Sequence, residues 1–238
     1  MKKAIVIGAT SGIGKSLAEL LIEEGYEVGV TGRREELFQS IKTQISSKIV
    51  CKKMDVQDLS NLESICNELV NHLGGLDLLI FSAGIGEENK NLNFDVENSI
   101  IKTNIQGFTC IADWAVRCFK EQGYGHLVNI SSIAGIRGNG IAPSYNSTKA
   151  YQINYLEGLR INVNHYGSSI TITDVRPGFV DTEMAKGEGL FWVAPVQKAA
   201  KQIFEAIKQK KQVVYITKRW KLIALLLRII PFSILKRV

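Results

Sequence analysis

The amino-acid sequence predicts an α/β fold: a doubly wound parallel sheet of about seven strands with helices on both faces. Short, nearly continuous apolar runs alternate with stretches of helical spacing, as expected for strands buried on both faces. The first apolar run ends in a glycine-rich turn that opens a helix. Right-handed crossovers then give the doubly wound arrangement, for which we expect the strand order 3-2-1-4-5-6-7. We expect one domain over residues 1–217, followed by a basic apolar tail at 218–238.

The elements follow one another along the chain without a linker or an internal repeat. The apolar runs place strands at residues 4–8, 27–31, 48–54, 76–81, 125–131, 169–175 and 212–217. Helical spacing falls between them, at residues 13–25, 35–42, 59–73, 96–121, 144–166 and 195–210. In the first helix, Ile13, Leu17, Leu20 and Leu21 share one face, and Gly25 closes the helix as a C-cap would.

The net charge of +6 belongs to the end of the chain. Residues 206–238 carry nine basic side chains and no acidic one, whereas the other 205 residues carry 20 basic and 23 acidic side chains. A nucleic-acid enzyme usually spreads basic charge over its binding face, so we expect no nucleic-acid partner. A basic segment beside apolar residues indicates a membrane surface or a partner instead.

The cysteines indicate a reducing compartment. Cys51, Cys66, Cys110 and Cys118 show no Cys-x-x-Cys spacing, and the last two lie eight residues apart in one expected helix, too far for a bridge. We expect four reduced thiols, a cytoplasmic protein and no metal site. Residues 1–8 already form a core strand, so we expect no signal peptide.

The glycine-rich turn reads Gly-Ala-Thr-Ser-Gly-Ile-Gly from Gly8 to Gly14. Glycines allow backbone N–H groups to approach a pyrophosphate, and the helix N-terminus adds a partial positive charge. A tight turn that needs glycine for its geometry alone is the structural alternative. We predict a dinucleotide site formed by Gly8, Thr10, Ser11, Gly12, Ile13 and Gly14.

The end of the second strand bears on the choice of cofactor. NAD-selective sites place an acid there for the ribose 2′-hydroxyl, but this strand ends Thr31-Gly32-Arg33-Arg34. The fork of Arg33, with Arg34 beside it, matches a 2′-phosphate. We therefore predict NADP(H), with NAD(H) as the weaker cofactor; the alternative is a pair of solvated residues that start a helix.

A catalytic pair opens the helix at 144–166. Tyr145 and Lys149 stand at i and i+4 on one helical face, where an ammonium would lower the pKa of the phenol, and Lys149 could also bond the cofactor ribose. Ser132, at the carboxyl end of the fifth strand, could donate to a substrate carbonyl. Ser131 is the competing serine, and the spacing to Tyr145 favours Ser132.

These motifs together resemble the short-chain dehydrogenase/reductase family, in its shorter single-domain branch, from about residue 3 to residue 216. The resemblance rests on Gly8-x-x-x-Gly12-x-Gly14, Asp55-Val56, Ser82-Ala83-Gly84, Asn104-x-x-Gly107, Asn129-Ile130-Ser131-Ser132, Tyr145-x-x-x-Lys149 and Pro177-Gly178-x-x-x-Thr182. Two positions depart from the family: Ile7 replaces a threonine and Ser82 replaces an asparagine. They put local hydrogen bonding in doubt rather than the chemistry.

The resemblance implies a Rossmann-type sheet and further site residues. It implies that Asp55 and Val56 contact the adenine, and that Asn104 holds a water in a proton relay from Lys149. Further cofactor contacts are implied for Ala83, Gly84, Pro177, Gly178, Val180 and Thr182, the last two at the nicotinamide end. It also implies a substrate lid at residues 183–195, where the apolar Met184, Phe191 and Trp192 indicate a hydrophobic substrate. Packing of these side chains onto the body is the alternative.

The predicted activity is that of an NADPH-dependent carbonyl reductase or alcohol dehydrogenase; the alternative is a non-catalytic, cofactor-sensing binding protein. The apolar segment of the tail is about fourteen residues long and is interrupted by Arg228 and Pro231, whereas a spanning helix needs ~20 apolar residues. Its flanking basic residues and Trp220 favour contact with the inner face of a membrane. An oligomer interface and a flap over the chain's own cleft are the alternatives. We expect a homodimer or homotetramer.

Overall fold

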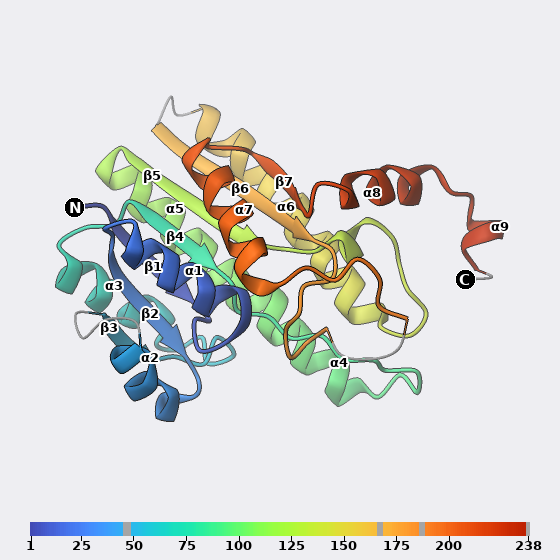
Figure 1. Ribbon diagram of the computed structural model, residues 1–238, viewed down its shortest axis with the longest axis horizontal. Coiled ribbons are helices and arrows are strands. Elements are labelled where there is room, and N and C mark those ends of the chain that lie inside the picture. Colours follow the sequence, from blue (N-terminus) through green and yellow to red (C-terminus); the bar gives the residue numbers. More distant parts are fainter. Residues whose placement is uncertain (45–48, 166–168, 186–188, 237–238) are drawn as a thin grey trace.

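The computed structural model describes residues 1–44, 49–165, 169–185 and 189–236. Within these ranges, seven parallel strands form one sheet in the order β3-β2-β1-β4-β5-β6-β7 (Figure 1), which confirms the predicted fold class and strand order. The strands are β1 (Lys3–Ile7), β2 (Glu27–Gly32), β3 (Val50–Lys53), β4 (Leu78–Phe81), β5 (Tyr124–Ile130), β6 (Ser169–Pro177) and β7 (Val213–Ile216).

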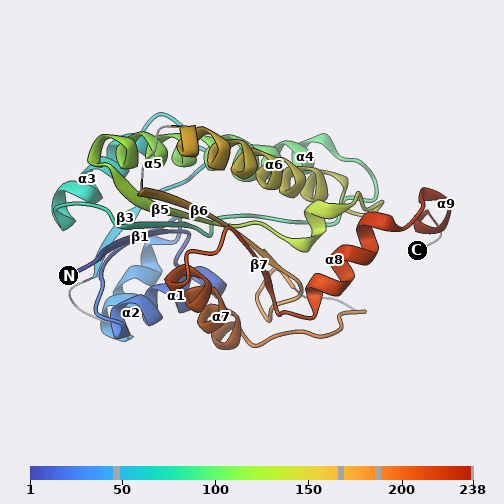
Figure 2. The same cartoon turned by 90° about the horizontal axis from the view of Figure 1, so that it is seen from above.

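Helices cover both faces of the sheet. Figure 2 shows α3, α4, α5 and α6 on one face and α1, α2 and α7 on the other. The helices are α1 (Gly12–Glu23), α2 (Phe38–Gln44), α3 (Leu62–Leu73), α4 (Phe94–Ile101), α5 (Phe108–Gln122), α6 (Pro143–His165), α7 (Val196–Lys208), α8 (Trp220–Ile229) and α9 (Phe232–Leu235), with short turns η1 (Glu35–Leu37), η2 (Lys102–Gly107) and η3 (Ile133–Ile136).

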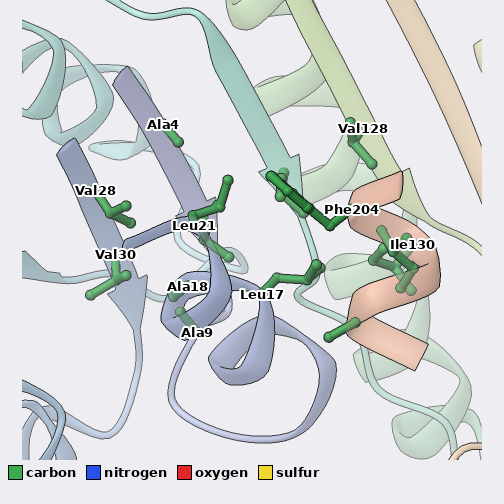
Figure 3. Close-up of a cluster of buried hydrophobic side chains, with 14 of the residues drawn as sticks. Ala4, Ala9, Leu17, Ala18, Leu21, Val28, Val30, Val128, Ile130 and Phe204 are labelled. Carbon is green, nitrogen blue, oxygen red and sulfur yellow. The ribbon is translucent and has the colours of Figure 1, made fainter. Parts of the chain in front are cut away.

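The strands divide their side chains between two cores. In β1, Ala4 and Val6 join the cluster under α1 and α7 (Figure 3), whereas Ile5 and Ile7 join the cluster under α3, α5 and α6. All four side chains are fully buried. This division explains why the strands are apolar along their whole length rather than alternating with polar residues.

Two predicted helices differ from those observed. The helix expected at 96–121 is interrupted by η2, a π-helical turn between α4 and α5. The helix expected from residue 59 begins at Leu62, because the Asp58 carboxylate accepts bonds from the backbone N–H and the hydroxyl of Ser60 and holds a turn there. Residue 48 of the expected third strand and residue 166 of the expected sixth helix lie outside the described residues.

The carboxyl ends of the parallel strands meet at one edge of the sheet. The glycine turn follows β1 and the arginine pair follows β2, and further candidate residues follow β3 to β6. The order of the strands reverses between β1 and β4, which is where open α/β sheets bind ligands. Helices α8 and α9 project beyond this same edge (Figures 1 and 2).

Candidate active site

The glycine turn after β1 is closely packed. Gly8 has a φ of +84°, and a β-carbon on it would lie 2.6 Å from the backbone nitrogen of Ala83. A β-carbon on Gly14 would lie 2.1 Å from the carbonyl oxygen of Gly8. Larger residues therefore do not fit at either position, and the turn brings α1 against the segment that follows β4.

The first turn of α1 suits an anion. The helix begins at Gly12, the side chain of the N-cap residue Ser11 makes no capping hydrogen bond, and the first turn contains no acidic residue. Its backbone N–H groups and partial positive charge therefore face outward without a neutralising side chain. These groups, with the glycine cradle, fit the pyrophosphate of a dinucleotide.

The arginine pair divides into two environments. The guanidinium of Arg34 donates to the Ser11 hydroxyl at 2.6 Å and to the Thr10 hydroxyl at 3.2 Å, and it pairs with Glu183 at 3.5 Å. Arg33 is exposed. The prediction placed the fork of Arg33 first, whereas in the structure the guanidinium of Arg34 lies directly on the glycine turn.

The segment after β3 forms the next part of this edge. Met54 follows the strand, and its backbone N–H donates to the carbonyl of Gly32 at 3.0 Å. Asp55 is exposed and accepts from the backbone of Gln57 at 3.0 Å, and Val56 is buried. A polar and an apolar side chain therefore stand side by side close to the end of β2.

The two serines after β5 have different partners. The Ser131 hydroxyl donates to the carboxylate of Asp174 and to the carbonyl of Val175 inside the protein. The Ser132 hydroxyl accepts from the backbone N–H of Ala134 at 3.1 Å, and it lies close enough to the phenol of Tyr145 to lower the pKa of that group. This arrangement favours Ser132 over Ser131 as the serine that could reach a substrate.

Tyr145 lies in the first turn of α6, partly buried. A β-carbon on Gly86, in the segment after β4, would lie 2.6 Å from Cδ2 of its ring. The ring thus packs against a bare stretch of backbone, and only glycine permits that distance. The Nζ atom of Lys149 lies 5.8 Å from the centre of the ring.

Lys149 is 3% exposed and is held from two sides. Its ammonium donates to the carbonyl of Ile130 at 3.1 Å and to the side-chain oxygen of Gln152 at 3.1 Å. A second acceptor on the same helix therefore holds the ammonium beneath the end of β5.

Gln152 connects Lys149 to Asn104. Its Nε2 donates to the backbone carbonyl of Asn104 at 2.9 Å, and its side-chain oxygen also accepts from Asn129 at 3.3 Å. The Asn104 side chain donates to the carbonyl of Ile85 at 2.8 Å and accepts from the backbone N–H of Ile85 at 3.0 Å. The family resemblance implies a water relay between Lys149 and Asn104. In the structure the side-chain amide of Gln152 bridges the Lys149 ammonium and the Asn104 carbonyl directly.

The pKa values of Tyr145 and Lys149 shift in opposite directions. Burial raises the pKa of the Tyr145 phenol, and the opposing effect comes from the hydrogen bond of Ser132, not from Lys149. Burial also lowers the pKa of Lys149 to about 8, with the charge of Asp174 opposing the shift. The expected effect of the Lys149 ammonium on the Tyr145 phenol stays a prediction; in the structure the ammonium bonds Ile130 and Gln152.

The segment after β6 returns to the glycine turn. A β-carbon on Gly12 would lie 3.3 Å from Cγ2 of Thr182, so this threonine covers the turn. Val180 is buried and forms a bridge with Ala194, while Pro177 ends β6 and Gly178 bonds the carbonyl of Ile216 at 2.7 Å. A hollow of about 410 Å³, lined by Ser11, Gly12 and Thr182 among others, opens beside the turn; Tyr145 does not line it.

The predicted substrate residues are on the surface. Met184 is 48% exposed, Phe191 48% and Trp192 42%. Phe191 and Trp192 contact Trp220 of α8, with ring centres 5.1 and 6.0 Å from it. The two aromatic residues of the expected lid therefore pack on the C-terminal tail, and residues 186–188 of the lid lie outside the described part of the chain.

Two residues of this site, Gln152 and Gly86, were not predicted from the sequence, and Trp220 was expected to contact a membrane and not the lid. Gln152 holds Lys149 and Asn104, Gly86 supports the ring of Tyr145, and Trp220 carries the aromatic residues of the lid. The pair Gly84-x-Gly86 was a usable signal for the second of these. The i+3 spacing placed Gln152 on the helical face of Lys149, but the sequence gives no signal for its partners Asn104 and Asn129.

Comparison with known proteins places this arrangement in context. The family model described as short chain dehydrogenase matches residues 2–190. An uncharacterized oxidoreductase of Staphylococcus aureus (strain USA300) is 37% identical over 187 residues, which is 76% of this chain and 79% of that protein. Residues 191–238, which include α8, lie beyond the match to the family model.

Two solved structures resemble the whole domain. The structure of ElxO with NADP bound has a TM-score of 0.80 at 28% identity and covers 90% of this chain and 97% of that one. A tyrosine-to-phenylalanine variant of ElxO with NADPH bound has a TM-score of 0.80 at 28% identity and covers 91% of this chain and 97% of that one.

Proposed function

The chain belongs to the short-chain dehydrogenase family of oxidoreductases, and from that premise we propose that it is an NADPH-dependent carbonyl reductase or alcohol dehydrogenase. The observation that carries the proposal is the convergence of Ser132, Tyr145 and Lys149 at the sheet edge that also bears the glycine turn. Bound NADPH supplies the hydride in this chemistry.

Tyr145 is the proposed general acid–base. In the reducing direction its phenol gives a proton to the substrate oxygen while the carbonyl carbon gains the hydride, so the products are an alcohol and the oxidised cofactor. Ser132 donates a hydrogen bond to the same oxygen, where negative charge develops. A correctly placed proton donor contributes roughly 10²–10⁴-fold in rate.

Lys149 and Asn104 complete the proposed catalytic set. With a pKa of about 8, Lys149 stays mostly protonated near neutral pH and could bond the cofactor ribose. Asn104 is fully buried and fixes the backbone of Ile85, next to Gly84 and close to Gly86. Gln152 is a positioning residue, since it bonds the Lys149 ammonium and the Asn104 carbonyl at once.

NADPH is the proposed cofactor in preference to NADH. Arg33 and Arg34 follow β2 directly, and no acidic side chain stands at the end of that strand. Arg34 lies on the hydroxyls of Thr10 and Ser11, beside the first turn of α1. A guanidinium there favours a 2′-phosphate, and the NADP and NADPH bound to the ElxO structures support the same choice.

The remaining cofactor contacts follow the carboxyl edge of the sheet. We assign the pyrophosphate to the glycine turn and α1, and the adenine to Asp55 and Val56. Ala83, Gly84, Pro177, Gly178, Val180 and Thr182 are assigned to the rest of the dinucleotide. The close approach of Gly12 and Thr182 supports the last of these assignments.

The substrate is proposed to be hydrophobic, because exposed Met184, Phe191 and Trp192 follow the cofactor segment. Free thiols at all four cysteines support a cytoplasmic protein. The proposal extends to a homodimer or homotetramer, and to contact between residues 218–238 and the inner face of a membrane. Among the described residues, no helix combines the length and apolar character that crossing a bilayer requires.

NADPH oxidation over a panel of aldehydes and ketones graded by chain length tests the function, with NADH run in parallel. We expect turnover that rises with chain length, and a kcat/KM for NADPH at least about tenfold above that for NADH. Arg34→Ala should remove most of that preference, whereas Lys53→Ala, an exposed cation at the end of β3, should keep it.

A chain that binds NADPH but oxidises it with no compound of the panel would favour the cofactor-sensing alternative. A preference for NADH that is the same in the intact chain, Arg33→Ala and Arg34→Ala would overturn the assignment of the arginine pair.

A further inference from the structure

Helix α8 has two apolar faces, and only one of them is covered. Trp220 and Ala224 are buried against the body, but Leu222, Leu225 and Ile229 are 69%, 59% and 71% exposed. Leu226, at 52% exposure, belongs to the same set. Positions i, i+3, i+4 and i+7 share one side of a helix, so these four side chains form a continuous apolar stripe, the outer face of α8.

Basic residues surround the outer face. Lys218, Arg219 and Lys221 precede or begin the helix, Arg228 lies near its end, and all four are exposed. The chain has no acidic residue after Glu205. The occupant of this face must therefore combine apolar groups with negative charge.

A bilayer with anionic headgroups meets both requirements. A ten-residue helix is about 15 Å long, half of the ~30 Å hydrocarbon core, so α8 would lie along the interface rather than cross it. Symmetric pairing of two outer faces would bring the basic residues of both copies together, which opposes a dimer through this surface.

The inner side of α8 is continuous with the lid. Trp220 is 3% exposed, and its ring lies 5.4 Å from that of Phe179 and 5.1 Å from that of Phe191. A β-carbon on Gly178 would lie 2.0 Å from the Trp220 ring, so the helix packs directly on the backbone that follows β6. The guanidinium of Arg219 also lies 4.8 Å from the centre of the Trp192 ring.

The far end of α8 approaches the catalytic side of the sheet. Arg137, just after η3, donates to the carbonyl of Ile230 at 3.2 Å, and η3 is capped by Ser132. Figures 1 and 2 show α8 beyond the edge at which the strands end. The helix thus stands beside both the lid and the segment that carries Ser132.

We propose that the outer face of α8 docks on an anionic bilayer and so holds Phe191 and Trp192 near it, and that the substrate is an amphipathic lipid carbonyl taken from that surface. The docking stands on the charge and exposure of α8 alone, whereas the choice of substrate rests on the proposed function. Phe191 and Trp192, which pack on the inner side of α8 through Trp220, then lie next to the docked helix, where an acyl chain could pass to the site.

Sedimentation of the full-length chain with vesicles tests the docking. We expect binding to phosphatidylglycerol vesicles, weaker binding to phosphatidylcholine vesicles, and loss of binding as salt is raised. Leu225→Glu should lower the partition coefficient at least about tenfold, because it places a charge in the apolar stripe. Leu59→Glu changes a leucine that is 45% exposed outside the tail and should bind as the intact chain does.

Two results would overturn the docking: an intact chain that stays in the supernatant with phosphatidylglycerol, or Leu225→Glu binding as tightly as the intact chain. Sedimentation velocity without vesicles provides a further check. A dimer or tetramer that Leu225→Glu converts to monomers would assign the face to a second copy of the chain.

A separate assay tests the proposal that the substrate is a lipid carbonyl taken from the bilayer. With NADPH, Leu225→Glu should reduce a water-soluble aldehyde at the rate of the intact chain and lose at least about tenfold on a long-chain ketone embedded in phosphatidylglycerol vesicles. Equal rates of the two proteins on the embedded ketone would reject the bilayer as the source. Absence of NADPH oxidation with every carbonyl would reject the proposed function and leave the vesicle-binding result standing.

Discussion

The surroundings of Lys149 act on its charge in opposite directions. Burial lowers its pKa to about 8, while the charge of Asp174, itself fully buried, raises it. Ile130 and Gln152 supply the acceptors that a buried ammonium needs. The lysine therefore remains a cation near neutral pH only because a carboxylate and two acceptors offset its desolvation.

Removing the amide of Gln152 should lower the pKa of Lys149 further. In Gln152→Leu the ammonium loses one acceptor, worth about 1.5 kcal/mol or more, so we expect the basic limb of the kcat profile against pH to move down by about one unit. Gln152→Glu places a carboxylate in the same position and should move that limb upward. Steady-state rates between pH 6 and 10 measure both shifts.

A purely structural role for Gln152 predicts a different outcome. The melting temperature of Gln152→Leu would fall, since the Asn104 carbonyl also loses its donor, while the pH profile of the active fraction would coincide with that of the intact chain. That coincidence would remove Gln152 from the set of positioning residues.

Single residues differed in how far the sequence could specify them. The spacing of Tyr145 and Lys149 predicted a shared helical face, and both lie on α6. The sequence favoured Ser132 over Ser131 by spacing alone. The structure supplies the physical reason, because the Ser131 hydroxyl is occupied by its hydrogen bond to Asp174. Gln152 could not be predicted, because its partners come from elements 48 and 23 residues away.

At the scale of elements, the long helix at 94–122 shows where periodicity is insufficient. The π-helical turn at 102–107 adds a wider loop without breaking the apolar pattern, so one continuous helix was predicted. Its effect is local: Asn104 and Thr103 are buried there, and Asn104 reaches both Ile85 and Thr148. The need for this π-helical turn becomes visible only in the packed structure, where it brings the Asn104 side chain to Ile85 and Thr148.

Helix α8 gives the opposite lesson. Its sequence is mostly apolar, with Lys221 and Arg228 as its charged residues, and that composition predicted a basic apolar tail but neither the helix nor its orientation. The contacts of Trp220 decide which face turns inward, since its ring fills the space above Gly178. A membrane, a second copy of the chain and the chain's own cleft differ in what would cover the exposed Leu222, Leu225, Leu226 and Ile229.

At the scale of the whole molecule, the strand order followed from the sequence because both of its causes are general. Alternating apolar runs and helices favour a parallel sheet, right-handed crossovers give the doubly wound arrangement, and 3-2-1-4-5-6 is the common strand order of such dinucleotide-binding sheets. The charge distribution was equally visible, with a slightly acidic body and a basic tail. The sequence did not show where the basic tail packs on the body. That position depends on β7, which directly precedes α8 and directs it toward the lid.

Global stability should fall in mildly acidic solution because of His126. Burial, with a smaller effect of Lys210, lowers its pKa from 6.5 to about 4. The unfolded chain then binds a proton that the folded chain refuses, so stability is full above about pH 6.5 and declines toward pH 4, by at most about 3 kcal/mol. Urea unfolding at several pH values measures this slope.

The control separates His126 from the other titrating groups. His126→Gln should flatten the decline between pH 6.5 and pH 4, whereas His72→Gln, at an exposed position on α3, should leave it unchanged. An identical slope in the intact chain and in His126→Gln would show that other groups control the acid sensitivity.

The central claim is that the Tyr145 phenol moves the proton of the reaction, and turnover by Tyr145→Phe tests it most directly. With NADPH and the best carbonyl of the panel, we predict a loss of about 10²–10⁴-fold in kcat and an NADPH Kd within about twofold of the intact chain. Tyr151 lies on the same helix as Tyr145, and its phenol bonds Thr109 of α5 at 2.9 Å. Tyr151→Phe removes that phenol and should turn over at the rate of the intact chain. Turnover by Tyr145→Phe at the rate of the intact chain would contradict the account.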